Sequence, residues 1–195
     1  MANQLGTKRT NGQATAQVDE LYMLRYEGNE EAENVLTTLT DKDADWFSCL
    51  SLKGTVQVGQ EAASIEKIQV DQFDAPIGIT AEPGDFTFEC FMPSFDNEDL
   101  EAWLGDDLKA LEEATDKVEG YALNLSGNLY TMSILVKTKI GPYPYMLFSR
   151  AQVSVSLGQE DKVFGFRVNG QILAPAHATN YPAYFIKKLP EIATA

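Results

Sequence analysis

The sequence predicts a mainly β protein, a β-sandwich or β-barrel with one short helical element packed on the sheet. Several segments alternate apolar and polar residues with a period of two, which is typical of half-buried strands; the clearest are residues 86–92 and 151–157. One segment, residues 96–104, instead has apolar residues at helical spacing. A sheet with a short helix lying against its apolar face satisfies both patterns.

The chain divides into an arm, one β domain and a tail. Residues 1–15 are polar and predict a flexible N-terminal arm. The domain is expected over 16–175, with its first strand over 18–24, and the C-terminal tail over 176–195. Within the domain, residues 27–45 are acidic and have no clear period. They predict a long loop of the kind that is functional or becomes ordered on binding.

The next stretch, residues 46–58, resumes the alternation and contains Gly54, which predicts a bulge or a bend. We expect five of its apolar residues on one face: Trp46, Leu50, Leu52, Val56 and Val58. Another strand is predicted over 63–70, followed by a turn and a short apolar stretch over 77–80.

The central stretch predicts the packing of the helix on the sheet. Phe86, Phe88, Cys90 and Met92 point to one side of a strand, and Pro93 ends its ladder because proline has no N–H to donate. Asp96 is a suitable N-cap for the helix that follows. The predicted contact between sheet and helix consists of five residues: Phe86, Phe88, Leu100, Trp103 and Leu104.

Beyond the helix, residues 106–117 are expected to continue it, with Leu108 and Leu111 on one side. The second half of the chain is predicted to be nearly all strand. Strands are expected over 129–137, 151–157 and 163–168, with residues 158–162 as the loop of a hairpin and a last short strand over 184–187.

The charge of the chain is strongly and unevenly negative. The net charge is −14; residues 1–120 hold 26 acidic and 8 basic residues (net −18), and residues 121–195 hold 3 acidic and 7 basic (net +4). This balance argues against a conventional DNA-binding surface, which needs clustered lysine and arginine. Two interpretations of this uneven charge remain open. The acidic residues form a solvated face, or they direct a negative field at a partner or a passage. If copies pack side by side, the acidic part of one could also meet the basic part of the next.

The sequence shows no catalytic or metal-binding pattern. His177 is the only histidine and has no nucleophile motif around it, so neither an enzyme nor a zinc site is expected. Residues 41–45 resemble the opening of a calcium loop, but its sixth and twelfth positions are Trp46 and Leu52 rather than glycine and glutamate. We expect no cofactor, two buried free thiols at Cys49 and Cys90, and no membrane segment or signal peptide, as in a protein of the cytoplasm.

Two stretches stand out together: IEKIQVDQFDAPIGITAEPGDFTFECFMPSFDNEDLEAWLG and the late strand pair AQVSVSLGQEDKVFGFRV. They resemble the phage tail tube family, which is related to the inner tubes of contractile injection and type VI secretion machines. The resemblance spans about residues 46–173 and is one of layout. It implies a structural subunit that assembles into hexameric rings, which stack into a tube through which DNA passes without specific binding.

The resemblance also implies partners, a location and candidate surfaces. The partners are further copies of the chain and other tail proteins, and the location is the virion tail, assembled in the host cytoplasm. Glu66 and Glu89, on the polar faces of strands, are candidates for an acidic lumen. Glu30, Glu31, Asp41 and Asp43, in the long acidic loop, are candidates for contacts between rings.

Two other classes of protein remain open. Another virion β-protein, such as a capsid decoration or head–tail joining subunit, would form oligomers without a stacked tube. A small binding module or enzyme on a lipocalin-like barrel would be a monomer with a ligand-sized apolar cavity.

Overall fold

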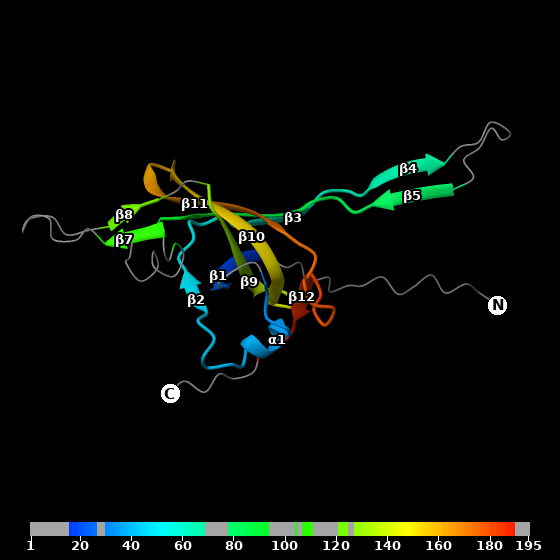
Figure 1. Cartoon of the computed structure of the whole chain (residues 1–195), viewed down its shortest axis with the longest axis horizontal. Coiled ribbons are helices and arrows are strands. Elements are labelled where there is room, and N and C mark those ends of the chain that lie inside the picture. The colour runs from blue at the N-terminus through cyan, green and yellow to red at the C-terminus, as the bar shows by residue number, and fades with distance from the viewer. Residues whose placement is uncertain are drawn as a thin grey trace, which may run out of the picture.

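The protein is a mainly β fold in which a curled sheet forms a half-barrel (Figure 1). The structure is a computed structural model and describes residues 16–26, 30–68, 78–93, 104, 107–110, 121–124 and 127–189. The predicted flexible arm over 1–15 lies outside these residues, as do Leu100 and Trp103 of the predicted helix.

The main sheet has eight strands in the order β2-β1-β9-β10-β11-β6-β3, with β12 beside the first part of β10. All of its neighbouring strands pair antiparallel. The bounds are β1 Ala16–Arg25, β2 Phe47–Cys49, β3 Gln57–Gln60, β6 Phe86–Met92, β9 Leu129–Ile140, β10 Tyr145–Glu160, β11 Val163–Ile172 and β12 Ala183–Ile186.

Two small hairpins and a helical turn complete the described fold. The hairpin of β4 (Ser64–Ile68) and β5 (Gly78–Glu82) extends from one side of the half-barrel, and the hairpin of β7 (Leu108–Ala110) and β8 (Tyr121–Leu123) lies on the other (Figure 1). The single turn of α1 (Val35–Thr38) is capped by Asn34, whose side chain accepts a hydrogen bond from the Leu36 N–H.

One apolar core fills the interior of the half-barrel. Every strand of β2-β1-β9-β10-β11-β6-β3 contributes apolar side chains to this core, which we call the core face of the sheet. Its largest fully buried members are Phe88, Phe148, Phe166, Leu21, Met23, Met132 and Ile134, with Leu104 packed among them. Cys49 and Cys90 are buried in the same core as free thiols, as predicted.

A second, smaller core lies on the opposite face of the sheet. Val35 and Leu39, in and just after α1, pack there against Leu135 of β9 and Leu147 of β10. The segment predicted as a loop without a period, residues 27–45, therefore supplies an apolar cover for part of the sheet. Trp46 joins this core and donates from its indole N–H to the Thr38 carbonyl oxygen at 3.1 Å.

The predicted continuation of the helix over 106–117 is wrong where the structure describes it. Leu108–Ala110 is strand β7, paired with β8, and Leu108 and Leu123 both pack against the main core. The spacing of Leu108 and Leu111 satisfied a helical pattern, but pairing with the next strand, β8, outweighs a weak local propensity.

The predicted single apolar face over 46–58 is also wrong. The stretch contains two short strands, β2 and β3, separated by a turn at Lys53–Gly54, and Leu50 is 67% exposed. The chain leaves the edge of β1 after Cys49 and crosses to β6, where the Leu52 N–H donates to the Phe91 carbonyl oxygen at 2.8 Å. The residues of this crossing, between β2 and β3, are not part of a strand, so they do not alternate between the two faces of the sheet.

The hairpin of β10 and β11 has a tighter turn than the predicted loop over 158–162. Only Asp161 and Lys162 lie between the strands, and both have positive φ angles, 47° and 68°, as a two-residue type I′ turn requires. The strands therefore extend past the core, which leaves Leu157 and Phe164 exposed near the tip.

Phe164 and Phe166 provide a matched test of this packing, because they lie two residues apart on β11. Phe166 is 2% exposed and Phe164 is 68% exposed. We expect Phe166→Ala to lower the free energy of unfolding by about 3–5 kcal/mol. Phe164→Ala should change it by less than about 0.5 kcal/mol. Urea unfolding of both variants measures the difference, and equal losses would contradict the placement of the core.

Candidate functional site

The side of the sheet away from the main core is exposed and polar across four strands. Successive register partners form one row of side chains, Gln57 on β3, Glu89 on β6, Asn169 on β11 and Ser154 on β10. A neighbouring row contains Thr87, Gln171 and Gln152. We call these seven residues the polar face. Glu89 is its single charged residue, so the surface is made mainly of neutral amides and hydroxyls.

Phe91 lies on the same side of β6 but is buried, because two glycines leave room for its ring. Gly158 and Gly165 are register partners on β10 and β11, and a Cβ on Gly165 would overlap the Phe91 ring and the Met92 backbone. A residue without a side chain is needed where two elements approach this closely. Arg167 on β11 and Ser156 on β10 continue the row of Phe91 and border the polar face at this end.

The hairpin of β4 and β5 is held away from the core by the pairing of β3 with β6. From here on we call this hairpin the arm; it is distinct from the predicted N-terminal arm over 1–15. The Glu61 N–H donates to the Asp85 carbonyl oxygen at 2.8 Å and extends that pairing to the base of the arm. A Cβ on Gly84 would overlap the backbone of Glu61 and Ala62, so this crossing requires glycine. From Gln60 to Ile68 the strand spans roughly 26 Å at ~3.3 Å per residue.

One face of the arm carries most of its exposed apolar side chains. Register pairs place Ile65, Ala81 and Ile79 on that side together with Lys67, and place Glu66, Ile68 and Thr80 on the other side. Ile65 is 64% exposed and Ile79 is 67% exposed. An isolated two-stranded hairpin is marginally stable in water. This exposed apolar face therefore has the properties of a contact surface.

A groove lies on the open side of the half-barrel, where the chain crosses from β2 to β3. β2 pairs with β1 only at Leu21–Met23, so within the described structure the edge of β1 at Val18–Glu20 has no strand beside it there. The groove has a volume of about 590 Å³. We call it the seam groove; its lining residues are Val18, Asp19, Ser51, Leu52, Lys53, Gly54, Val56 and Lys139.

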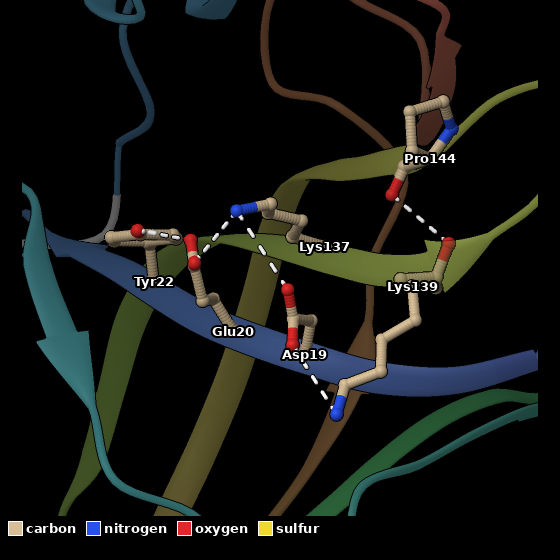
Figure 2. Close-up of polar contacts among 7 residues, drawn as sticks. Asp19, Glu20, Tyr22, Lys137, Lys139 and Pro144 are labelled. Carbon is tan, nitrogen blue, oxygen red and sulfur yellow. Dashed lines mark hydrogen bonds and ion pairs between the residues drawn. The ribbon is translucent and has the colours of Figure 1, made fainter.

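A network of charged side chains borders the seam groove (Figure 2). Lys137 Nζ lies 2.6 Å from Glu20 Oε1 and 3.8 Å from Asp19 Oδ2, and Lys139 Nζ lies 3.6 Å from Asp19 Oδ1. The Tyr22 hydroxyl donates to Glu20 Oε2 at 2.5 Å. The hydrogen bond from Lys137, followed by that from Tyr22, lowers the pKa of Glu20. The network fixes Asp19 and Lys139 at the rim of the groove.

The four candidates for contacts between rings do not share one environment. Glu30, Asp41 and Asp43 are exposed, whereas Glu31 is 4% exposed. Glu31 Oε1 accepts hydrogen bonds from the backbone N–H of His177 at 3.2 Å and from Asn180 Nδ2 at 3.1 Å. Glu31 therefore joins the acidic segment to the C-terminal segment of its own chain.

Further hydrogen bonds strengthen this connection. Asn180 Oδ1 accepts from the Val35 N–H at 3.1 Å, and the Thr179 hydroxyl donates to the Glu33 carbonyl oxygen. The imidazole Nε2 of His177 lies 3.1 Å from the Glu31 carbonyl oxygen, to which its N–H tautomer donates. The only histidine of the sequence thus has a structural contact, and it anchors the segment that precedes α1.

The two lumen candidates lie on different surfaces. Glu89 belongs to the polar face of the main sheet, whereas Glu66 is on the arm, on the side opposite Ile65 and Ile79. The sequence predicted a strand over 63–70, which carries Ile65, but only a short apolar stretch over 77–80, which carries Ile79. It did not predict the exposure of either residue, which alternation alone does not report. The seam groove had no signal in the sequence, because its lining comes from three separated segments.

The described residues show neither a metal site nor a membrane helix. Nowhere among them do three or more histidine, cysteine, aspartate or glutamate side chains group so as to hold a metal ion. Likewise, none of the helical residues described here belongs to a helix long and apolar enough to span a membrane.

Glu20→Gln tests the ion pair at the rim of the seam groove. The pKa of Glu20 is lower in the folded chain than its usual value of 4.5, so the pair stabilises the fold at neutral pH. This contribution is lost as the pH falls below about 4.5 and through the folded pKa. Both side chains are partly exposed, so we expect a loss of up to about 1 kcal/mol at pH 7.

Unfolding of the native chain and of Glu20→Gln is compared at pH 7 and pH 3. The two chains should differ at pH 7 and converge at pH 3. Glu160→Gln, which removes the 3.6 Å pair with Arg167 at the other end of β10, serves as a control of the same charge change. A difference between the native chain and Glu20→Gln that grows in acid would contradict the assignment.

Neither a scan against protein-family models nor a search of curated proteins found a match for this chain. The inference of function therefore depends on the residues and geometry described above.

Proposed function

We propose that this protein is a structural, self-assembling subunit of a phage-type tail tube. In this proposal, copies form hexameric rings that stack into a tube, and DNA passes through the channel without specific binding. The subunit has no catalytic role and no cofactor, and it belongs in the virion tail, after assembly in the host cytoplasm with other tail proteins.

The observation that carries the proposal is the exposed apolar face of the arm. Ile65, Ala81 and Ile79 lie together on a hairpin that extends away from its own core (Figure 1). A surface of this kind is stabilised when a partner covers it. Contacts between two different surfaces of identical subunits generate rings when the rotation closes and open-ended stacks when it does not. Both outcomes are needed to build a tube.

The polar face supports the role of a channel wall. DNA-binding surfaces displace counterions with clustered lysine and arginine, which this face lacks among its seven residues. Nearby Arg167 is paired with Glu160 at 3.6 Å. In a ring of copies, Glu89 would contribute one carboxylate per subunit to an otherwise neutral wall. Such a wall would repel phosphates weakly and would offer few sites at which DNA could be held.

The alternatives from other classes have less support. A lipocalin-like binding protein needs a ligand-sized space inside the barrel, but Phe88, Phe148 and Phe166 fill the interior of this half-barrel. A capsid decoration or head–tail joining subunit would use the same arm and polar face. It differs from a tube subunit in forming a closed oligomer that does not stack.

Negative-stain electron microscopy of the concentrated protein, with light scattering on the same sample, tests the proposal. Hollow tubes or stacked rings of uniform diameter are expected. Closed oligomers that never stack would favour the decoration or joining role, and a monomer at every concentration would contradict self-assembly.

The arm gives a sharper prediction with a neighbouring control. Ile79→Asp places a charge on the apolar face, whereas Thr80→Asp places the same charge on the opposite face of the same strand. We expect Ile79→Asp to abolish tubes while leaving the unfolding transition of the subunit unchanged, because Ile79 is 67% exposed. Thr80→Asp should still form tubes. If both variants assemble equally well, the apolar face is not a contact surface.

Glu89→Lys tests the polar face as the channel wall. The substitution converts a ring of carboxylates into a ring of ammonium groups, which should attract DNA with an affinity that falls as salt rises. We expect Glu89→Lys tubes to retain short fluorescent DNA at low salt, whereas native tubes do not. Glu33→Lys, on the exposed acidic segment, is the control. Retention by Glu33→Lys tubes but not by Glu89→Lys tubes would place the polar face outside the channel.

A further inference from the structure

We propose that the arm of one copy docks in the seam groove of a second copy, where it lies beside the free edge of β1. Ile65 and Ile79 of the arm then cover Val18, Leu52 and Val56 of the groove. This inference rests on the proposed function for the presence of neighbouring copies, and it names the two surfaces that they join.

The arm cannot reach the seam groove of its own chain. Its base is fixed by the pairing of Glu61 with Asp85 and by the close backbone crossing at Gly84. From that base it extends away from the half-barrel, whereas the groove lies beside β1 (Figure 1). An arm that fills this groove therefore belongs to another copy.

The two surfaces match in apolar character. The groove has half-buried Val18, Leu52 and Val56 in its lining, with charged side chains at its rim. Its volume of about 590 Å³ lies within the ~300–1,000 Å³ of pockets that enclose a small ligand. This space is sufficient for the two exposed isoleucine side chains of the arm. Docking would bury apolar area on both partners.

The two surfaces also match in backbone hydrogen bonding. Both outer edges of the β4–β5 hairpin lack a strand partner among the described residues, and so does the edge of β1 at Val18–Glu20. An unpaired edge is a template for another strand. Adding an arm strand to β1 would supply main-chain hydrogen bonds to both edges, while the side chains above them provide specificity.

The net charges of the arm and of the groove have opposite signs. The described arm and its base, residues 61–68 and 78–82, carry Glu61, Glu66 and Glu82 against Lys67, a net of −2. The lining of the groove carries Lys53 and Lys139 against Asp19, a net of +1, in a chain whose net charge is −14. Lys67 lies on the face that docks and Glu66 and Glu82 lie on the opposite face, so this attraction acts between the net charges of the two surfaces and not through direct contacts.

The contact is heterologous, because arm and groove are different parts of the chain. Each copy can donate one arm and accept another, so the contact can propagate from copy to copy without limit unless it closes into a ring.

Directed disulfide formation tests the inference. Ile79→Cys on the arm and Ser51→Cys in the groove are prepared as separate full-length variants, mixed in equal amounts and mildly oxidised. Cys49 and Cys90 are buried, and burial raises the pKa of the Cys90 thiol, so the native thiols should not compete. We expect a heterodimer at least about tenfold faster than with the control Ser156→Cys, because docking raises the effective concentration of the two thiols.

A second pair, Ile65→Cys with Lys53→Cys, repeats the test at different positions, and the unfolding transition of each variant shows that it folds. Selective cross-linking by either pair supports the docking. Tubes without selective cross-linking in both pairs would overturn this inference and leave the proposed function standing. Selective cross-linking without tubes would support the docking and overturn the proposed function. A monomer that binds a fluorescent fatty acid in the groove and does not cross-link would assign the groove to a small ligand.

Discussion

The burial of one face of a single curled sheet is the constraint on which the rest of the structure depends. Each large apolar side chain that leaves water contributes about 1.5–3 kcal/mol, and seven neighbouring strands direct such side chains into the same interior. Once that interior is filled, the other face of the sheet is free to differ along its length. Among the described residues, the outer edges of the edge strands and of the arm likewise have no strand beside them, which makes them surfaces available for contacts.

The strand β10 shows how that other face is divided. Its first part is apolar on both sides, with Leu147 under the cover of α1 and Phe148 in the main core. An irregularity in its pairing with β9 separates Phe148 from Ala151, and beyond it Gln152 faces solvent while Val153 faces the core. The first part of β10 thus buries side chains on both faces of the sheet, whereas its second part buries them on one face only. The polar face is the consequence of that change.

The sequence predicted the elements better than their surroundings. Alternation located β6, β9, β10 and β11 because the pleat forces a period of two wherever one face is buried. It could not show that Leu50 and Phe164 are exposed, since exposure depends on where the core ends. It also assigned Leu108 to a helix, because Leu108 and Leu111 have helical spacing and the pairing with β8 leaves no local signal. The seam groove was unpredictable because its lining comes from segments far apart in the sequence.

The contact between Glu31 and Asn180 has a consequence for the order of events during synthesis. The two residues are separated by 149 positions. At ~5–20 residues per second, the ribosome needs roughly 7 to 30 s to add the second after the first. Until then the segment around Val35 can pack against Leu135 and Leu147 but lacks the hydrogen bonds that Asn180 provides, so the outer layer on this face of the sheet stays incomplete. In the proposed assembly, each copy would therefore complete this outer layer only when its C-terminal segment has been made.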